Sequence, residues 1–247
     1  MNRRSNRKLG ILGILVLVGT MAGLAIYFLV LRKPADFNRS LKIQEWLSDP
    51  ASHPDWAVSL GTKCADAPFL IPTNGLIGYL WGDHFKIGTS HQGIDIFGGS
   101  QPGITPVVAA YDGYLTRLAD WKSSVIIRIP SDPTQPGRQI WTYYTHMADP
   151  NGQSFISVQF PPGTANVFVK AGTLLGYQGD YSGDPNNPVG VHLHFSIVKD
   201  DGKGGFTNEL DIQNTYDPSP YLGLKLNFNQ ATDFFPTCSG TQENPIQ

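Results

Sequence analysis

Residues 190–197, GVHLHFSI, decide the fold of this chain and contain its most informative side chains. In an extended strand successive side chains point to opposite faces, so one apolar face carries Val191, Leu193, Phe195 and Ile197. The opposite face then presents the imidazoles of His192 and His194 side by side. The stretch therefore predicts a β-strand that holds two histidines on a rigid apolar support.

Other short runs carry the same kind of signal. Residues 123–130, 138–147 and 166–177 are rich in β-branched and aromatic side chains and are separated by turn clusters. The 27 glycines, 19 prolines and only 15% charged residues favour short strands joined by turns over long charged helices. We therefore expect a mainly β protein, with an antiparallel β-sheet domain at residues 64–238, a concave active-site groove, and a C-terminal tail at 239–247.

The N-terminal part has a different composition. Residues 9–31 contain no charge and would measure about 35 Å as a helix, against a hydrocarbon core of about 30 Å. This length favours an uncleaved transmembrane signal anchor over a cleaved signal peptide. The basic tail at 1–8 is more positive than the residues that follow the span, which keeps the N-terminus in the cytoplasm. We expect a single-pass protein of the cell membrane, in contact with the lipid bilayer through 9–31, whose β domain is extracytoplasmic.

Residues 32–63 read as a stalk between the span and the β domain. Within it, SLKIQEWLSDP at 40–50 predicts a short amphipathic helix that starts at Ser40 and stops at Pro50. Two placements of this helix are open from the sequence: packed on the β domain as a spacer, or lying on the membrane surface.

The net charge of −2 hides an uneven distribution. The first 33 residues hold six basic side chains and no acidic one, which leaves 12 basic against 20 acidic residues in the remainder. An acidic surface repels phosphate backbones. We therefore expect no nucleic-acid partner.

The two cysteines, Cys64 and Cys238, lie far apart and form no CxxC motif. In an oxidising compartment a disulfide is their natural pairing, and it would tie the start of the β domain to its end. The alternative is a pair of buried free thiols.

The histidines carry the chemistry. Zinc is bound by imidazole nitrogen and carboxylate oxygen, and a catalytic zinc site uses three protein ligands and leaves one position for water. His91, Asp95 and His194 supply such a set. His146 and His192 are then available for the proton transfer and oxyanion stabilisation that hydrolysis also needs.

The order HxxxD, YxH and GxHLHF resembles the motif pattern of the lysostaphin-type zinc endopeptidases, bacterial enzymes that cut peptide cross-links in peptidoglycan. The resemblance covers roughly residues 68–223. It includes a V-x-A-x-x-D-G turn at 107–113 and a V-x-x-G-x-x-x-G-x-x-G stretch at 169–179.

This resemblance implies roles for individual residues. It implies one Zn²⁺ per chain, bound by His91, Asp95 and His194. It also implies that His146 and His192 are the catalytic pair, but it does not decide which of them is the general base. Tyr144, two residues before His146, is a weaker prediction for the rim of the substrate groove.

The chain departs from the family pattern at three places. The family often has Pro before HLHF and Glu after it, where this chain has Val191 and Ser196. The segment 179–190, which would border the groove, is longer and more acidic than usual. Substrate preference is therefore open.

The sequence favours a membrane-anchored zinc metalloendopeptidase that hydrolyses peptide bonds of peptidoglycan cross-links. Two alternatives belong to other classes. One is a non-hydrolytic or autoinhibited cell-wall-binding regulator of another hydrolase. The other is a zinc endopeptidase acting on a Gly-rich protein.

Overall fold

The computed structural model describes residues 35–84, 89–231, 235–238 and 241–242. The chain divides into two compact units, Met1–Leu41 and Lys42–Gln247, of which the second contains the β-sheet. The elements in chain order are α2 Ala35–Ser48, η2 Pro50–Ser52, η3 Pro54–Trp56, β1 Ala57–Val58, β2 Thr62–Lys63, β3 Gly75–Tyr79, β4 Ile94–Phe97, β5 Pro106–Val108, β6 Gly113–Thr116, β7 Val125–Ile129, β8 Ile140–Thr145, β9 Val167–Val169, β10 Leu174–Tyr177, β11 Leu193–Lys199, η4 Ile212–Asn214, β12 Thr215–Tyr216, α3 Ser219–Leu222 and β13 Thr241–Gln242.

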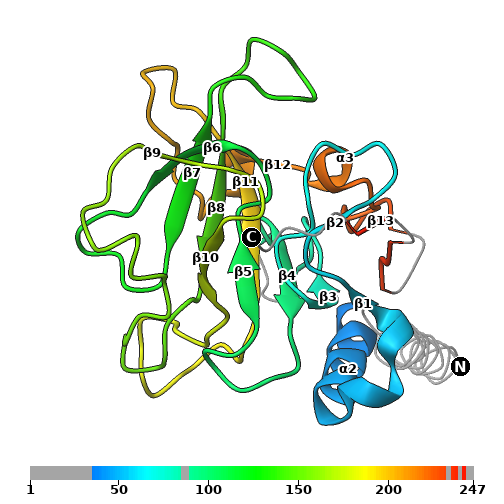
Figure 1. The fold of residues 1–247 in the computed structure, drawn as a ribbon. Helices are drawn as coiled ribbons and strands as arrows, with labels where there is room; N and C mark the ends of the chain where they lie inside the picture. The colour runs from blue at the N-terminus through cyan, green and yellow to red at the C-terminus, as the bar shows by residue number, and fades with distance from the viewer. Residues whose placement is uncertain (1–34, 85–88, 232–234, 239–240, 243–247) are drawn as a thin grey trace, which may run out of the picture. The chain divides into compact units, whose positions relative to one another are not determined.

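One large sheet organises the second unit (Figure 1). Within the described residues it contains nine strands in the order β1-β3-β4-β11-β8-β7-β6-β9, with β12 pairing the end of β11. Its strand pairs are antiparallel, and β11 lies between β4 and β8. The prediction of a mainly β, antiparallel domain is confirmed.

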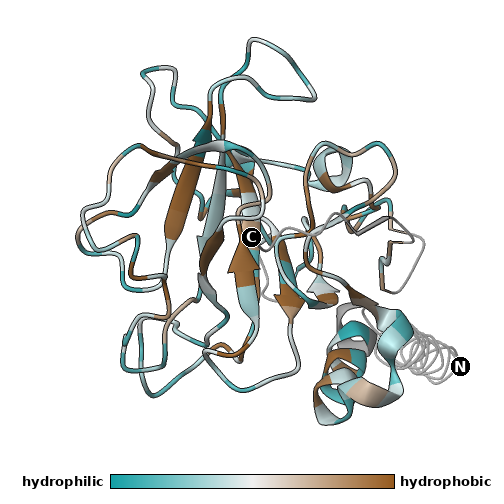
Figure 2. Ribbon diagram, in the orientation of Figure 1, coloured by the Kyte–Doolittle hydropathy of each residue, from teal (hydrophilic) through white to brown (hydrophobic). Residues whose placement is uncertain are grey.

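The alternation read from residues 190–197 decides which face of β11 enters the core. Leu193, Phe195 and Ile197 are fully buried, and they share one hydrophobic cluster with Val107 of β5 and Leu175 of β10. The two-stranded sheet β10-β5 therefore covers the apolar side of the large sheet. Figure 2 shows hydrophobic colour concentrated on the strands and hydrophilic colour on the connecting loops.

The helix α2 is longer than predicted. Residues 35–48 contain no Pro or Gly, so the helix begins at Ala35 and Ser40 lies inside it rather than at its start. It ends at Ser48, as expected from Pro50, because the residue before a proline disfavours helical geometry. The indole Nε1 of Trp46 donates to the carbonyl of Phe97 at 3.2 Å. This contact favours the spacer placement of the predicted helix.

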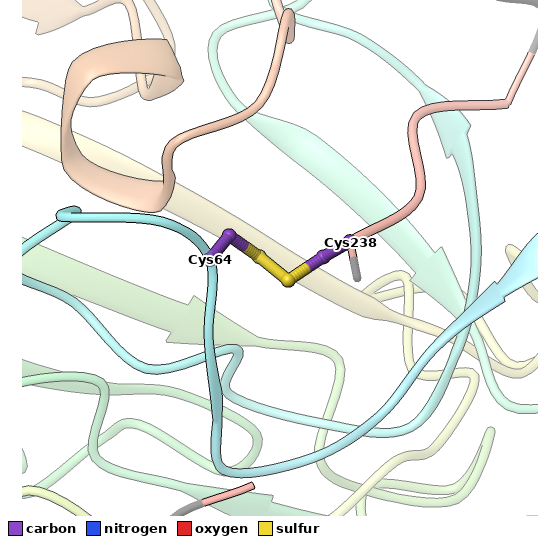
Figure 3. Close-up of a disulfide and its surroundings, with 2 residues drawn as sticks. All are labelled: Cys64 and Cys238. Carbon is purple, nitrogen blue, oxygen red and sulfur yellow. A yellow bond between two sulfur atoms is a disulfide. The ribbon is translucent and has the colours of Figure 1, made fainter. Parts of the chain in front are cut away.

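Two short strands lie in the stretch expected to be a stalk. β1 pairs with β3, and β2 pairs with β13 near the C-terminal end. Close to β2 the structure joins Cys64 to Cys238 in a disulfide, with their Cα atoms 5.5 Å apart (Figure 3). The two ends of the β domain are therefore linked both by a strand pair and by a covalent bond.

The predicted transmembrane anchor, residues 9–31, lies outside the described residues. In the part of the chain that the structure describes, no helix has both the length and the apolar character that a membrane crossing requires.

A buried acidic group fixes the loop between β7 and β8. The carboxylate of Asp132, which is fully buried, accepts hydrogen bonds from the guanidinium of Arg138, from the backbone N–H and hydroxyl of Thr134, and from the hydroxyl of Tyr221 at 2.8 Å. Burial raises the pKa of Asp132, but the hydrogen bonds from Arg138, Thr134 and Tyr221 outweigh it, so that the pKa lies below its ordinary value. This group connects the β7–β8 loop to α3.

We expect Asp132→Asn to lower the free energy of unfolding by about 2–3 kcal/mol at pH 7, because Arg138 and Tyr221 lose a buried anionic acceptor. The pKa of Asp132 is lower in the folded chain than in the unfolded chain. Its ionised carboxylate therefore stabilises the fold at pH values above the unfolded-state pKa, and this stabilisation is lost as the pH falls through the folded-state pKa. Urea unfolding at pH 7 and at pH 3 measures both effects. Equal unfolding free energies for the two proteins at pH 7 would contradict this account.

Candidate active site

Asp95 of β4 and His194 of β11 lie directly opposite each other in the antiparallel register. Paired residues of neighbouring strands project from the same face, so their side chains meet. This register depends on Gly93, because a Cβ there would lie 2.3 Å from the carbonyl oxygen of Phe195. The glycine inside the HxxxD motif therefore allows the chain entering β4 to lie against β11.

His91 reaches the same point from the segment before β4. Its backbone is held by two hydrogen bonds, His91 N–H to Asp83 O and Gly82 N–H to His91 O, each 2.8 Å. Its ring Nδ1 is 3.0 Å from the carbonyl oxygen of Leu80. A carbonyl oxygen only accepts, so Nδ1 carries the proton and Nε2 presents a lone pair.

Three donor atoms converge between these residues. His91 Nε2 is 3.1 Å from Asp95 Oδ1 and 3.0 Å from His194 Nδ1, and His194 Nδ1 is 2.9 Å from Asp95 Oδ1. The three residues form a buried group that could hold a metal ion. Zn–N and Zn–O bonds of about 2.0–2.1 Å in a tetrahedron place ligand atoms about 3.3 Å apart. The donor types and their spacing fit a zinc ion with three protein ligands.

The electrostatics of this group favour a cation. Burial raises the pKa of Asp95, but the neighbouring rings of His91 and His192 outweigh it and hold the pKa well below its ordinary value. Burial lowers the pKa of His194, yet the carboxylates of Glu209 and Asp95 raise it to about 10. Asp95 is therefore an anion, and positive charge is stabilised among the three donor atoms.

The two remaining predicted histidines lie beside this group. The rings of His146 and His192 have their centroids 4.6 Å apart, and the ring of His146 is 6.2 Å from that of His194. His146 Nδ1 is 2.7 Å from the carbonyl oxygen of Tyr181, and His192 Nδ1 is 2.9 Å from that of Gly190. Each Nδ1 therefore carries a proton, and each Nε2 bears a lone pair that can accept another.

Burial favours the neutral form of both histidines. Burial, together with the nearby rings of His192 and His194, lowers the pKa of His146 to about 3. Burial also lowers the pKa of His192, against the opposing effect of Asp95. Two imidazoles, each with Nε2 available as an acceptor, thus stand next to the three-ligand group.

A backbone turn places His146 in the pocket. β8 ends at Thr145, and His146 adopts a left-handed φ of +73°, which is uncommon for a residue other than glycine. Gly179 lies against this turn, where a Cβ would be 2.5 Å from the carbonyl oxygen of His146. The close approach brings the segment 179–192, with His192 at its end, beside His146.

This turn corrects the expectation for Tyr144. In β8 Tyr144 pairs with Phe195, is fully buried in the core, and accepts a hydrogen bond from the backbone N–H of Ala110. Alternation alone puts Tyr144 and His146 on one face, but the positive φ at His146 breaks the alternation at the end of the strand. Its neighbour Tyr143 lines the groove instead, together with Tyr79 and Tyr181.

The five histidine and aspartate side chains open into a pocket of about 640 Å³. One wall carries hydroxyl groups: Tyr143 Oη donates to Ser124 Oγ at 2.9 Å, and Ser124 Oγ lies 2.6 Å from Thr145 Oγ1. The lining also includes Tyr181, Pro188 and Val189 of the segment 179–190, which therefore borders the groove as predicted. The described lining residues include two carboxylates and no Lys or Arg.

Sequence reasoning missed Glu209. Its carboxylate oxygen Oε1 lies 2.8 Å from His194 Nε2, on the side of the ring that faces away from Asp95. Glu209 follows β11 in an irregular stretch, fifteen residues beyond His194, where neither alternation nor a motif indicates its direction. The sequence contains no signal that would have identified it.

No family model matches the chain, and no curated protein does. Similar solved structures include the catalytic domain of the antimicrobial peptidase lysostaphin from Staphylococcus simulans, 22% identical, covering 59% of this chain and 90% of that one, with a TM-score of 0.39. Csd3 from Helicobacter pylori is 18% identical over 66% of this chain and 36% of its own, with a TM-score of 0.38. A catalytic-domain variant of the prophage-encoded M23 protein EnpA from Enterococcus faecalis is 21% identical, covering 60% of this chain and 95% of its own, with a TM-score of 0.35. The chain is similar to lysostaphin-type peptidase domains, the family that its motifs also resemble.

Proposed function

We propose that the chain is a zinc metalloendopeptidase that hydrolyses peptide bonds of peptidoglycan cross-links. The observation that carries the proposal is the convergence of His91 Nε2, Asp95 Oδ1 and His194 Nδ1 within 2.9–3.1 Å of one another, beside the rings of His146 and His192. The motif resemblance supplies the substrate class. The predicted anchor at 9–31 leads us to propose an extracytoplasmic domain held near the membrane.

The chemistry divides between the metal position and the histidine pair. A zinc ion held by His91, Asp95 and His194 would polarise the scissile carbonyl and lower the pKa of the attacking water. His146 and His192 each hold Nδ1–H on a backbone carbonyl and keep Nε2 as the acceptor. One imidazole takes the proton from the attacking water, and the imidazolium so formed can return it to the leaving amine.

The pocket lining suits an interior stretch of peptide. Arg and Lys side chains form strong hydrogen bonds with a terminal carboxylate, and the described lining residues include neither. The hydroxyls of Tyr143, Ser124 and Thr145 can instead hydrogen-bond with peptide groups along the groove. Cleavage within a peptide is the reaction that this lining supports.

Digestion of purified peptidoglycan by the full chain in detergent tests the proposal. We expect soluble fragments whose new ends are amines and carboxylates, and loss of their release with a zinc chelator. A Gly-rich protein digested in parallel is expected to remain intact. Bound zinc without fragment release would favour a cell-wall-binding regulator, and cleavage of the Gly-rich protein alone would favour the other alternative.

A further inference from the structure

Glu209 is a largely buried carboxylate that the proposed hydrolysis does not use. Its side chain is 13% exposed, and Oε1 accepts from His194 Nε2 at 2.8 Å and from the Ser196 hydroxyl at 3.3 Å. Burying a carboxylate is unfavourable unless it is paired and hydrogen-bonded. The contact with His194 therefore gives the buried charge its partner.

The contact decides how His194 presents its ring. A carboxylate accepts, so Nε2 carries a proton, and Nδ1 is the ring nitrogen that faces Asp95 Oδ1 at 2.9 Å and His91 Nε2 at 3.0 Å. A bound metal ion would take the place of any proton on Nδ1. Metal-binding histidines commonly donate their second ring N–H to a carboxylate, which fixes the tautomer and orientation of the ring. Glu209 stands in that relation to His194.

The loop that carries Glu209 is held in place from two directions. The side-chain amide of Gln92, the neighbour of His91, donates to the carbonyl oxygen of Leu210 at 2.8 Å. The backbone N–H of Thr207 donates to Lys199 at the end of β11 at 3.0 Å. The loop is thus tied to the segments that supply both histidine ligands, and the position of its carboxylate is determined by them.

Residue 196 leaves room for this arrangement. It lies two positions after His194 on β11, on the same face, where the family pattern has Glu and this chain has Ser196. The short side chain donates to Glu209 instead of filling the space beside His194. A longer acidic side chain at 196 would meet the Glu209 carboxylate with like charge.

We propose that Glu209 is a positioning residue that holds His194 in the tautomer and orientation needed to bind zinc. The inference rests on the proposed function, because it presumes that His194 is a zinc ligand. Glu209 does not belong to the group of three donor atoms, and it contacts that group through the imidazole of His194.

Zinc competition against a chromophoric chelator, with the full-length chain in detergent, tests this role. We expect Glu209→Ala to weaken zinc binding by about 10- to 100-fold. Glu209→Gln, which keeps an acceptor oxygen but loses the charge, is expected to fall between Glu209→Ala and the wild type. Hydrolysis by Glu209→Ala should recover when zinc is added in excess, which a folding defect would not allow.

Asp211→Ala is the matched control. Asp211 lies in the same loop and its carboxylate accepts from the backbone N–H of Gln213 at 2.9 Å, at the start of η4. We expect the zinc affinity of Asp211→Ala to stay within twofold of that of the wild type. Circular dichroism of each variant checks that the β-sheet has formed.

Three results would overturn the inference, and they differ in whether they also refute the proposed function. Wild-type affinity in Glu209→Ala would refute the role of Glu209 and leave the proposed function intact. An equal loss in Glu209→Ala and Asp211→Ala would assign the effect to the loop as a whole. A wild-type chain that binds no zinc would refute the proposed function and this inference together.

Discussion

Replacing His146 by alanine is expected to lower the rate of peptidoglycan hydrolysis by about 100- to 10,000-fold while zinc stays bound. His146 lies beside the three-ligand group without belonging to it, and its Nδ1 proton is engaged by the carbonyl of Tyr181. Losing this ring removes a proton acceptor and leaves the donor atoms of the metal position in place. His192→Ala is expected to lower the rate by about 100- to 1,000-fold.

Initial rates of fragment release, measured together with zinc content, test this prediction. His53→Ala is the matched control, because that ring stacks on Trp56 at 3.9 Å and does not line the pocket. We expect its rate to equal that of the wild type. A His146→Ala variant within threefold of the wild-type rate would remove His146 from the mechanism.

Loss of the disulfide has the largest expected effect on stability. Cys64 and Cys238 are 174 residues apart, and in the chain-entropy model closing such a loop stabilises the fold by about 5 kcal/mol. Measured losses on removing native disulfides are typically about 2–5 kcal/mol. We expect the double variant Cys64→Ser, Cys238→Ser to lose a free energy of unfolding in that range.

Denaturant unfolding of the double variant and of the wild type, with and without a reductant, measures this loss. Reduced wild type is expected to unfold with the same free energy as the double variant. Identical unfolding curves for oxidised and reduced wild type would show that the bond contributes nothing to stability. The β2–β13 strand pair would then be the connection that holds the two ends together.

Sequence periodicity was informative where the chain is regular. Alternation along β11 predicted that Phe195 enters the core and that His194 faces the site. In the structure Phe195 lies in the core and His194 lines the pocket. His194 meets Asp95 because strand pairing brings opposite residues together. These features follow from local rules of extended chains, which a single sequence carries.

The rest depended on contacts that no local pattern encodes. The Tyr144 prediction was wrong because it carried alternation past the end of β8, where His146 turns with a positive φ. Glu209 reaches His194 from an irregular loop, so only the folded structure brings the two together. The start of α2 at Ala35 could not be predicted from a cap signal. Serine is a favoured N-cap residue, so Ser40 indicated a later start although it lies inside the helix.

The most direct test of the central claim is zinc content by elemental analysis of the full-length chain, beside His194→Ala and Asp95→Ala, with peptidoglycan hydrolysis assayed on the same samples. The account predicts close to one zinc per wild-type chain, and loss of both zinc and hydrolysis in the two variants. A wild-type chain without zinc, or a His194→Ala variant that hydrolyses peptidoglycan at the wild-type rate, would contradict it.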